Sequence, residues 1–129
     1  MSNRSKGNAF EAEFCEMLAK SGFWVHNMAQ NAAGQPADVI AVRSYEHYLI
    51  DCKVCQNNKF SVSRIEPNQH HAMRHWKDCT DGVGWFALKL DSGIYMISYQ
   101  MLCMSKRTIL TEQEIKSLGI PLERWVNLI

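Results

Sequence analysis

The stretch PADVIAVRSYEHYLIDCKV, residues 36–54, contains two short apolar runs with charged residues at their edges. DVIAV and YLIDCKV are rich in strand-forming residues, and the polar segment between them suits a turn, so the pattern predicts a β-hairpin. Asp38 opens the first strand, while Asp51 and Lys53 lie two apart near the end of the second. Strand residues two apart point to the same face of a sheet. The hairpin would therefore bring Asp38, Asp51 and Lys53 together at one end of the sheet.

These three side chains suit one kind of chemistry. Two converging carboxylates bind a hard divalent cation such as Mg²⁺, for which Mn²⁺ can substitute. A neighbouring lysine orients an attacking water and stabilises charge on a phosphate. The cluster thus predicts metal-assisted hydrolysis of a phosphodiester bond. The alternative is structural, because acidic residues also cap strand ends and an Asp-x-Lys triplet often arises by chance.

The composition predicts one soluble globular domain over residues 1–129. Apolar residues make up 47% of the chain and charged residues 21%, which argues against an intrinsically disordered protein. No apolar run approaches the roughly 18 residues of a membrane span, and the N-terminus lacks the apolar core of a signal peptide. Five cysteines, an odd number, indicate reduced thiols. We expect an intracellular protein, of host or phage origin, with no membrane partner.

The rest of the chain predicts further helices and strands. Helical spacing of apolar residues, or capping signals, indicates helices at 7–22, 66–79 and 111–119. Runs rich in β-branched and aromatic residues indicate strands at 23–28, 83–90 and 93–99, with an extended segment at 59–65 and a loop at 29–36. This order predicts an α/β fold with a mixed central β-sheet flanked by helices. Residues 1–6 are expected to form a basic arm, and residues 103–129 a C-terminal helical extension.

The first predicted helix carries two candidate acids. On a helical wheel Glu11 lies at one margin of the apolar stripe formed by Phe10, Phe14 and Leu18, and Glu13 lies at the other. Periodicity does not choose between the two, and either acid could simply be a solvated residue at the edge of the helix.

Basic residues gather in the middle of the chain although the net charge is only +1. Six Lys or Arg side chains there and near the N-terminus are candidates for contacts to a DNA backbone: Arg4, Lys6, Lys59, Arg64, Arg74 and Lys77. A zinc site is a weaker alternative. His71 and His75 are four apart next to His70, and Cys52 and Cys55 form one CxxC, but neither group finds further ligands at suitable spacing.

The hairpin resembles the PD-(D/E)xK signature of restriction-endonuclease-like nucleases, with Pro36, Asp38, Asp51 and Lys53 in the motif positions. The resemblance extends from about Lys6 to Leu102 and is closest to Holliday-junction resolvases, both the archaeal type and the RecU type of bacteria.

Two further residues match those resolvases. KGNAFEAEFCEMLAKSGFWV is similar to the opening helix of the archaeal group, and Glu11 stands where that helix carries a glutamate. FSVSRIEPNQHHAMRHW resembles the segment after the motif lysine, with Gln69 in the place of a glutamine that accompanies the catalytic cluster. VGWFALKLDSGIYMISYQML resembles the closing hairpin.

The resemblance implies a restriction-endonuclease-like fold and a Mg²⁺-dependent DNA endonuclease that cuts four-way junctions as a homodimer. It implies that Asp38, Asp51 and the backbone carbonyl of Cys52 ligate the metal, and that Glu11 assists directly or through water. Lys53 would position the attacking water, with Gln69 supporting the lysine or the phosphate.

Some departures leave alternatives open. The second acid of the motif is usually glutamate, whereas Asp51 is shorter, and RSYEH is too short for the stalk that RecU-type proteins insert in their sheet. Another repair, restriction or phage-type endonuclease is the alternative enzyme. A DNA-binding module that keeps the fold without catalysis is the alternative outside enzymes, and intact Asp38, Asp51 and Lys53 argue against it.

Overall fold

The computed structural model describes residues 2–28 and 37–128 of the chain. Over these residues the elements follow in the order α1 (Asn3–Lys20), β1 (Trp24–Asn27), β2 (Val39–Arg43), β3 (Glu46–Val54), η1 (Gln56–Asn58), β4 (Phe60–Ser61), η2 (Val62–Arg64), α2 (Pro67–Thr80), β5 (Gly84–Leu90), β6 (Gly93–Ser98), α3 (Tyr99–Ser105), β7 (Ile109–Leu110), α4 (Glu112–Leu118), β8 (Ile120–Pro121) and α5 (Leu122–Leu128). The predicted loop at 29–36, including Pro36 of the motif, lies outside the described residues.

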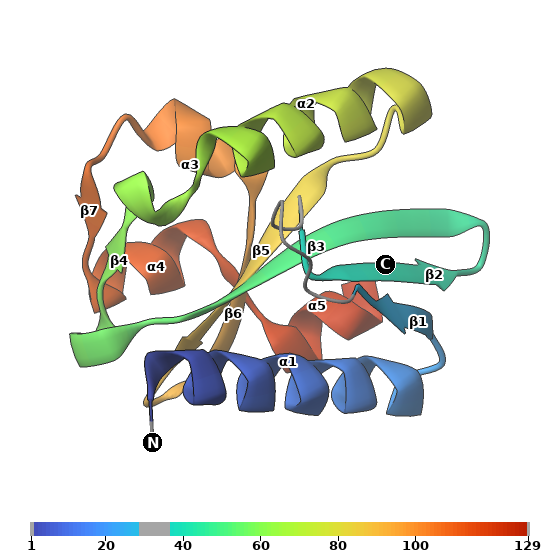
Figure 1. Ribbon diagram of the computed structural model, residues 1–129, viewed down its shortest axis with the longest axis horizontal. Helices are drawn as coiled ribbons and strands as arrows, with labels where there is room; N and C mark the ends of the chain where they lie inside the picture. Colours follow the sequence, from blue (N-terminus) through green and yellow to red (C-terminus); the bar gives the residue numbers. More distant parts are fainter. Residues whose placement is uncertain (1, 29–36, 129) are drawn as a thin grey trace.

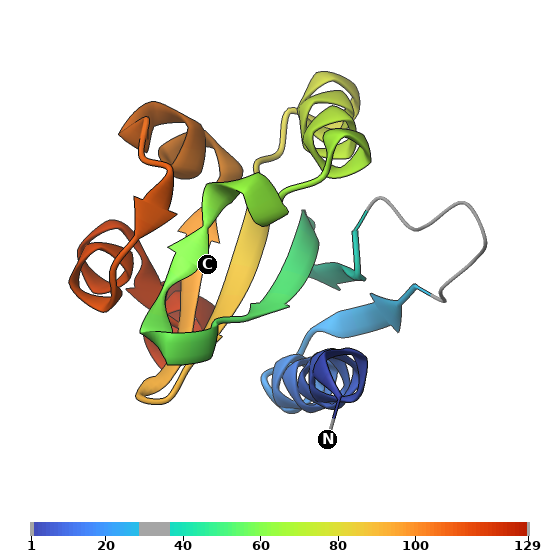
Figure 2. The same cartoon turned by 60° about the vertical axis from the view of Figure 1, so that its left-hand side comes forward.

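The described strands build a six-stranded sheet in the order β1-β2-β3-β5-β6-β8, and β4 pairs with β7 in a small second sheet. β3 and β5 run parallel and the other neighbours antiparallel, so the predicted mixed sheet is confirmed. Figures 1 and 2 show the sheet between two layers of helices. One core contains buried residues of α1 and α5, and the other contains buried residues of α2, α3 and α4.

The N-terminal boundary differs from the prediction. The helix begins at Asn3, because the hydroxyl of Ser2 accepts a hydrogen bond from the backbone N–H of Ser5 at 3.1 Å and caps it. Arg4 and Lys6 therefore lie in the opening turns of α1, whereas the sequence placed them in a basic arm before the helix. The consequence is that these side chains are carried by a helix whose direction is fixed by the core.

The C-terminal part of the chain is more than a helical extension. Its strand β8 pairs with β6 and completes the main sheet, and Trp125 of α5 is fully buried. The Trp125 ring stacks on Phe23 at 5.9 Å between centroids. As far as they are described, residues 103–129 thus contain the helices α4 and α5 and also contribute to the sheet and the core. Two-residue strands such as β7 and β8 are too short to show a period of two in sequence.

The predicted β2–β3 hairpin is confirmed, with Arg43 paired to Glu46 beside a two-residue turn. Ser44 and Tyr45 in this turn have φ values of 54° and 69°, the left-handed conformation of a type I′ turn. That conformation is costly for residues with a Cβ, and the Tyr45 side chain is fully exposed, so no packing offsets the cost.

We expect Tyr45→Gly to raise the free energy of unfolding by about 1 kcal/mol, because glycine adopts positive φ without steric penalty. Chemical denaturation of the purified protein measures the change. Tyr45→Ala is the control, since alanine keeps the penalty and should leave stability close to that of the parent. Equal stabilities of the glycine and alanine variants would contradict this account of the turn.

The hairpin leaves part of β3 unpaired on one side. Pairing with β2 ends at Val39 opposite Ile50, whereas pairing with β5 continues to Val54. Residues 51–54 of β3 therefore have no partner strand on the β2 side among the described residues. This open edge contains Asp51 and Lys53, two of the three charged residues of the motif.

Candidate active site

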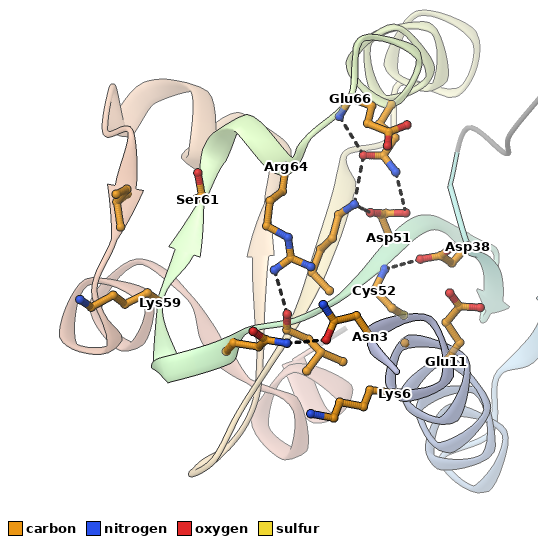
Figure 3. A pocket seen from close by; sticks show the side chains of 16 residues that line it. Asn3, Lys6, Glu11, Asp38, Asp51, Cys52, Lys59, Ser61, Arg64 and Glu66 are labelled. Atoms are coloured by element: carbon orange, nitrogen blue, oxygen red, sulfur yellow. Dashed lines mark hydrogen bonds and ion pairs between the residues drawn. The ribbon is translucent and has the colours of Figure 1, made fainter. Parts of the chain in front are cut away.

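The open edge of β3 lies in a cleft of about 690 Å³. Residues of α1, the start of β2, β3, the η1–η2 segment and the beginning of α2 line it (Figure 3). The structure brings all five predicted catalytic side chains to this one cleft: Glu11, Asp38, Asp51, Lys53 and Gln69.

Asp51, Lys53 and Gln69 form a connected polar cluster. The Lys53 Nζ lies 3.2 Å from Asp51 Oδ2 and donates to Gln69 Oε1 at 3.3 Å, while Gln69 Nε2 donates to Asp51 Oδ1 at 3.4 Å. Asp51 is only 1% exposed and Gln69 8%. The two-residue spacing on β3 places the carboxylate and the ammonium side by side, as the sequence predicted, and α2 supplies the amide that contacts both.

Gln69 is held by its place at the start of α2. It is the third residue of the helix, and its Oε1 also accepts a hydrogen bond from the backbone N–H of Glu66 at 3.0 Å, which forms half of a capping box. The same amide oxygen therefore caps the first turn of α2 and accepts a hydrogen bond from the Lys53 ammonium. The local sequence Glu-Pro-Asn-Gln thus determines where the amide points.

Asp38, just before β2, lies across from the open edge of β3 and contacts its backbone. Its Oδ2 accepts a hydrogen bond from the backbone N–H of Cys52 at 2.8 Å, and its own N–H donates to the carbonyl of Ile50 at 3.2 Å. In an extended strand the N–H and C=O of one residue point to the same side. The carbonyl of Cys52 therefore faces the same side as its N–H, which is the side of Asp38 and the cleft.

The structure separates the two acids that the helical wheel left equivalent. Glu11 lines the cleft, and Figure 3 shows its carboxylate rising from α1 close to that of Asp38. Glu13 points elsewhere and forms an ion pair with Lys89 of β5 at 2.8 Å. Tertiary contacts therefore select Glu11, which agrees with the position implied by the family resemblance.

Burial and the charge of Asp38 raise the pKa of two carboxyl groups in the cleft, those of Asp51 and Glu11. Burial is the largest cause at Asp51 and raises its pKa well above the usual value, with further repulsion from Asp38 and an opposing effect of Lys53. Partial burial, followed by the charge and hydrogen bonding of Asp38, raises the pKa of Glu11 from 4.5 to about 7, and Lys53 again opposes the shift. A cation in the cleft would offset this repulsion and the cost of burying the charges.

A pH-dependent stability follows for the protein in EDTA. Between about pH 4.5 and 7 the folded state holds the Glu11 proton more tightly than the unfolded state, so the free energy of unfolding falls as pH rises through this window. Glu11→Gln removes that contribution, and we expect it to stabilise the protein above pH 7 by about 1 kcal/mol, a value reduced for the exposure of the group. At pH 4 the variant and the parent should be equally stable.

Thermal or chemical unfolding at several pH values measures this difference. Glu13→Gln is the matched control, because it changes an acid two positions away that lies outside the cleft. A Glu11→Gln curve parallel to that of the parent from pH 4 to 8 would contradict the raised pKa.

Three of the six predicted DNA contacts lie at the cleft. Lys6, Lys59 and Arg64 line it, and Arg64 is fixed by donating from Nη1 to the carbonyl of Val54 at 2.8 Å. Arg4, Arg74 and Lys77 do not line it. Lys77 instead lies 3.7 Å from Asp81 at the far end of α2. The cleft therefore has a basic rim around a carboxylate centre.

The donor set of the cleft suits a magnesium-like ion. Mg²⁺ in proteins is often held by one or two carboxylates together with waters and substrate phosphate oxygens. Among the described residues no group of three or more His, Cys, Asp or Glu side chains forms a metal cage. Asp38, Asp51 and the Cys52 carbonyl are oxygen ligands of the expected type, and among the described residues the buried Oδ2 of Asp51 has the Lys53 ammonium as its ion-pair partner. These residues fit the ion.

The comparisons with known proteins agree with this geometry. The family model for archaeal Holliday junction resolvases (Hjc) matches residues 2–129, nearly the whole chain. The chain belongs to this family. A curated relative in the Hjc family, the crossover junction endodeoxyribonuclease of Methanocaldococcus jannaschii, is 24% identical over 115 residues, which cover 89% of this chain and 82% of the relative.

The fold matches a solved structure of Hjc as well. The Holliday junction resolvase Hjc of Archaeoglobus fulgidus superposes with a TM-score of 0.74 at 20% sequence identity, covering 93% of this chain and 99% of that one. The predicted restriction-endonuclease-like fold is confirmed. None of these matches supports the phage origin that the sequence left open. Over the described residues, no helix is long and apolar enough to cross a membrane.

In this member of the Hjc family no histidine is among the described residues that line the cleft, and Cys52 is the one cysteine among them. His71 and His75 stack on the exposed face of α2 at 5.9 Å between ring centroids, and His70 bonds the Tyr99 hydroxyl at 2.8 Å. None of the five cysteines forms a disulfide, as predicted. The described residues thus give no support to the zinc alternative, for which the sequence had also found too few ligands.

Several polar residues of this resolvase cleft were not predicted from the sequence. Gln56 Nε2 donates to Asn3 Oδ1 at 2.6 Å and joins η1 to the first turn of α1 across the cleft. Ser61 and Glu66 also line the wall. Asn3 lies eight residues before Glu11, so helical spacing could have placed it on the same face, but nothing in the sequence near Gln56 indicates its partner.

Proposed function

We propose that this member of the Hjc family is an endodeoxyribonuclease that hydrolyses phosphodiester bonds in four-way DNA junctions with the help of a divalent cation, Mg²⁺ or, in its place, Mn²⁺. The observation that carries the proposal is the contact of Asp51, Lys53 and Gln69 beside Asp38 at the open edge of β3. A binding module has no need to bury one carboxylate and place a second against the same strand, because burying charge is costly.

The side chains of the cleft would have different roles in hydrolysis. Asp38, Asp51 and the carbonyl of Cys52 would hold the cation, with Glu11 acting directly or through a water. When bound, the cation supplies charge for the scissile phosphate and lowers the pKa of a water. Lys53 would hold the attacking water by hydrogen bonding and neutralise charge that develops on the phosphate. Gln69 positions Lys53 through the contact at 3.3 Å.

The basic rim would bind the DNA backbone. Lys6, Lys59 and Arg64 line the cleft and are suited to phosphate oxygens, which give affinity and salt dependence without base specificity. Arg4, Arg74 and Lys77 lie away from the cleft and would contact only more distant arms of a junction.

A homodimer follows from the proposed substrate. Resolving a four-way junction needs two symmetric incisions, and a two-fold dimer offers two equivalent clefts. Light scattering of the purified protein and of its junction complex tests this part, and two protomers on each junction are expected. A single protomer that makes both cuts would contradict it.

The function is tested by cleavage of four-way junctions, linear duplex and single-stranded DNA in Mg²⁺, in Mn²⁺ and in EDTA. We expect cuts in the junction with either metal and none in EDTA. Preference for linear duplex would replace the junction assignment by another endonuclease activity. DNA binding without cleavage in any metal would instead support the non-catalytic module.

A further inference from the structure

Three residues recur at every fourth position along α1 and face the same cleft. Asn3, Gly7 and Glu11 all line it, as expected for a helix, in which residues four apart lie on one face. Asn3 contacts Gln56, and Glu11 lies beside Asp38. Gly7 lies between them and presents only backbone to the cleft.

The fold itself does not explain a glycine at this position. Gly7 lies inside an 18-residue helix, and its φ is not positive, so any L-residue could adopt its backbone conformation. A Cβ built at Gly7 would meet no atom of the described residues within 4 Å. Glycine destabilises a helix interior relative to alanine. The chain therefore carries a destabilising residue where alanine would fit.

The absent side chain affects the cleft. Lys6, the preceding residue, lines the same cavity with its ammonium (Figure 3), and the Asn3–Gln56 hydrogen bond spans it near the first turn of α1. A ligand with anionic groups that enters at Lys6 can approach the helix backbone closely at Gly7. Glycine is commonly found where a ligand approaches a backbone in this way.

We propose that Gly7 is a seat for the sugar–phosphate backbone of the DNA strand being cut, next to the scissile phosphate. The inference rests on the proposed nuclease function and names a substrate contact for it. One helical turn separates Gly7 from Glu11, about 6 Å along the helix axis. For a strand that runs along α1, a rise of about 3.4 Å per nucleotide would place the seat one to two nucleotides from the proposed metal-binding carboxylates. Gly7 would contact the sugar–phosphate backbone and not the bases, so the contact would be the same for every DNA sequence.

Side chains of increasing size at Gly7 test the seat. Gly7→Ala should raise the midpoint of thermal unfolding by about 2–4 °C, because alanine favours the helix. Gly7→Leu has open space around its Cβ and should fold as stably as the parent. Both should nevertheless bind four-way junctions more weakly in EDTA and cut them more slowly in Mg²⁺. We expect decreases of about threefold for alanine and tenfold or more for leucine, each tenfold being about 1.4 kcal/mol.

The neighbouring residue provides the matched control. Asn8 is exposed on α1 and does not line the cleft, so Asn8→Ala and Asn8→Leu should change binding and cleavage less than twofold. The inference is overturned if Gly7→Leu binds and cuts as the parent does, or if Asn8→Leu is equally impaired.

Failure of the proposed function gives a different result. If the parent prefers linear duplex, the junction assignment fails, yet weaker binding and slower cutting by Gly7→Leu on that duplex still support the seat. If the parent does not bind DNA, both proposals fail.

Discussion

Replacing Asp51 by asparagine is expected to lower kcat for junction cleavage by at least about a thousandfold, equivalent to about 4 kcal/mol of transition-state stabilisation. The substitution keeps the shape of the side chain and removes the charge of a proposed metal ligand. Asp51 is buried, and its charged form contacts both Lys53 and Gln69, so no neighbour can take over its role. Single-turnover cleavage of a labelled four-way junction at saturating protein measures the effect.

The decrease in kcat should not come from unfolding. Burial and the nearby Asp38 raise the pKa of Asp51, so its charge costs folding energy in the absence of metal, and removing it should leave the melting temperature in EDTA unchanged or higher. Asp78→Asn, an exposed acid of α2, is the control and should cut at the parental rate. Cleavage by Asp51→Asn at more than a tenth of the parental rate would contradict the metal site.

Lys53→Met and Lys59→Met are expected to fail in different ways. Lys53 is nearly buried, with 14% of its side chain exposed, and is held between Asp51 and Gln69. Removing a group that is proposed to position water and stabilise charge should lower kcat by about a hundredfold to a thousandfold. Junction affinity in EDTA should change less than threefold, because the ammonium already has an ion-pair partner.

Lys59 is exposed on the rim of the cleft and is expected to contribute to DNA affinity but not to kcat. Lys59→Met should weaken junction binding and reduce the slope of log K against log salt by about one for each phosphate that the lysine neutralises in the parent. At saturating DNA its kcat should stay near the parental value. The division of roles would be wrong if Lys53→Met reduced mainly affinity, or if Lys59→Met reduced mainly kcat.

The part of the site that is local in sequence could be predicted from it. A period of two, a turn between two apolar runs and charged residues at the edges were enough to place Asp38, Asp51 and Lys53 together. These features act within one hairpin, where pairing register follows from the turn. The start of α2 was also visible, because Glu66 and Pro67 are typical of a first turn.

Contacts between distant segments could not be predicted in this way. Glu11 and Glu13 are equivalent on a helical wheel, and only the approach of Lys89 from β5 and of Asp38 from the start of β2 separates them. The Asn3–Gln56 hydrogen bond joins residues 53 apart in sequence. The start of α1 was missed for a different reason, since the Ser2 capping signal was present but lay in a polar stretch without apolar periodicity.

The geometry of the site and the first turn of α2 depend on one shared atom, Oε1 of Gln69. Oε1 accepts from the Glu66 backbone, which stabilises the first turn of α2, and from Lys53. Helix ends fray more readily than the elements they join. If this turn opened, Lys53 would lose its neutral partner and keep its acidic one, and the water proposed to lie at Lys53 would no longer be fixed. Under the proposed mechanism, cutting would then depend on the stability of a single helical turn and not only on that of the sheet beneath it.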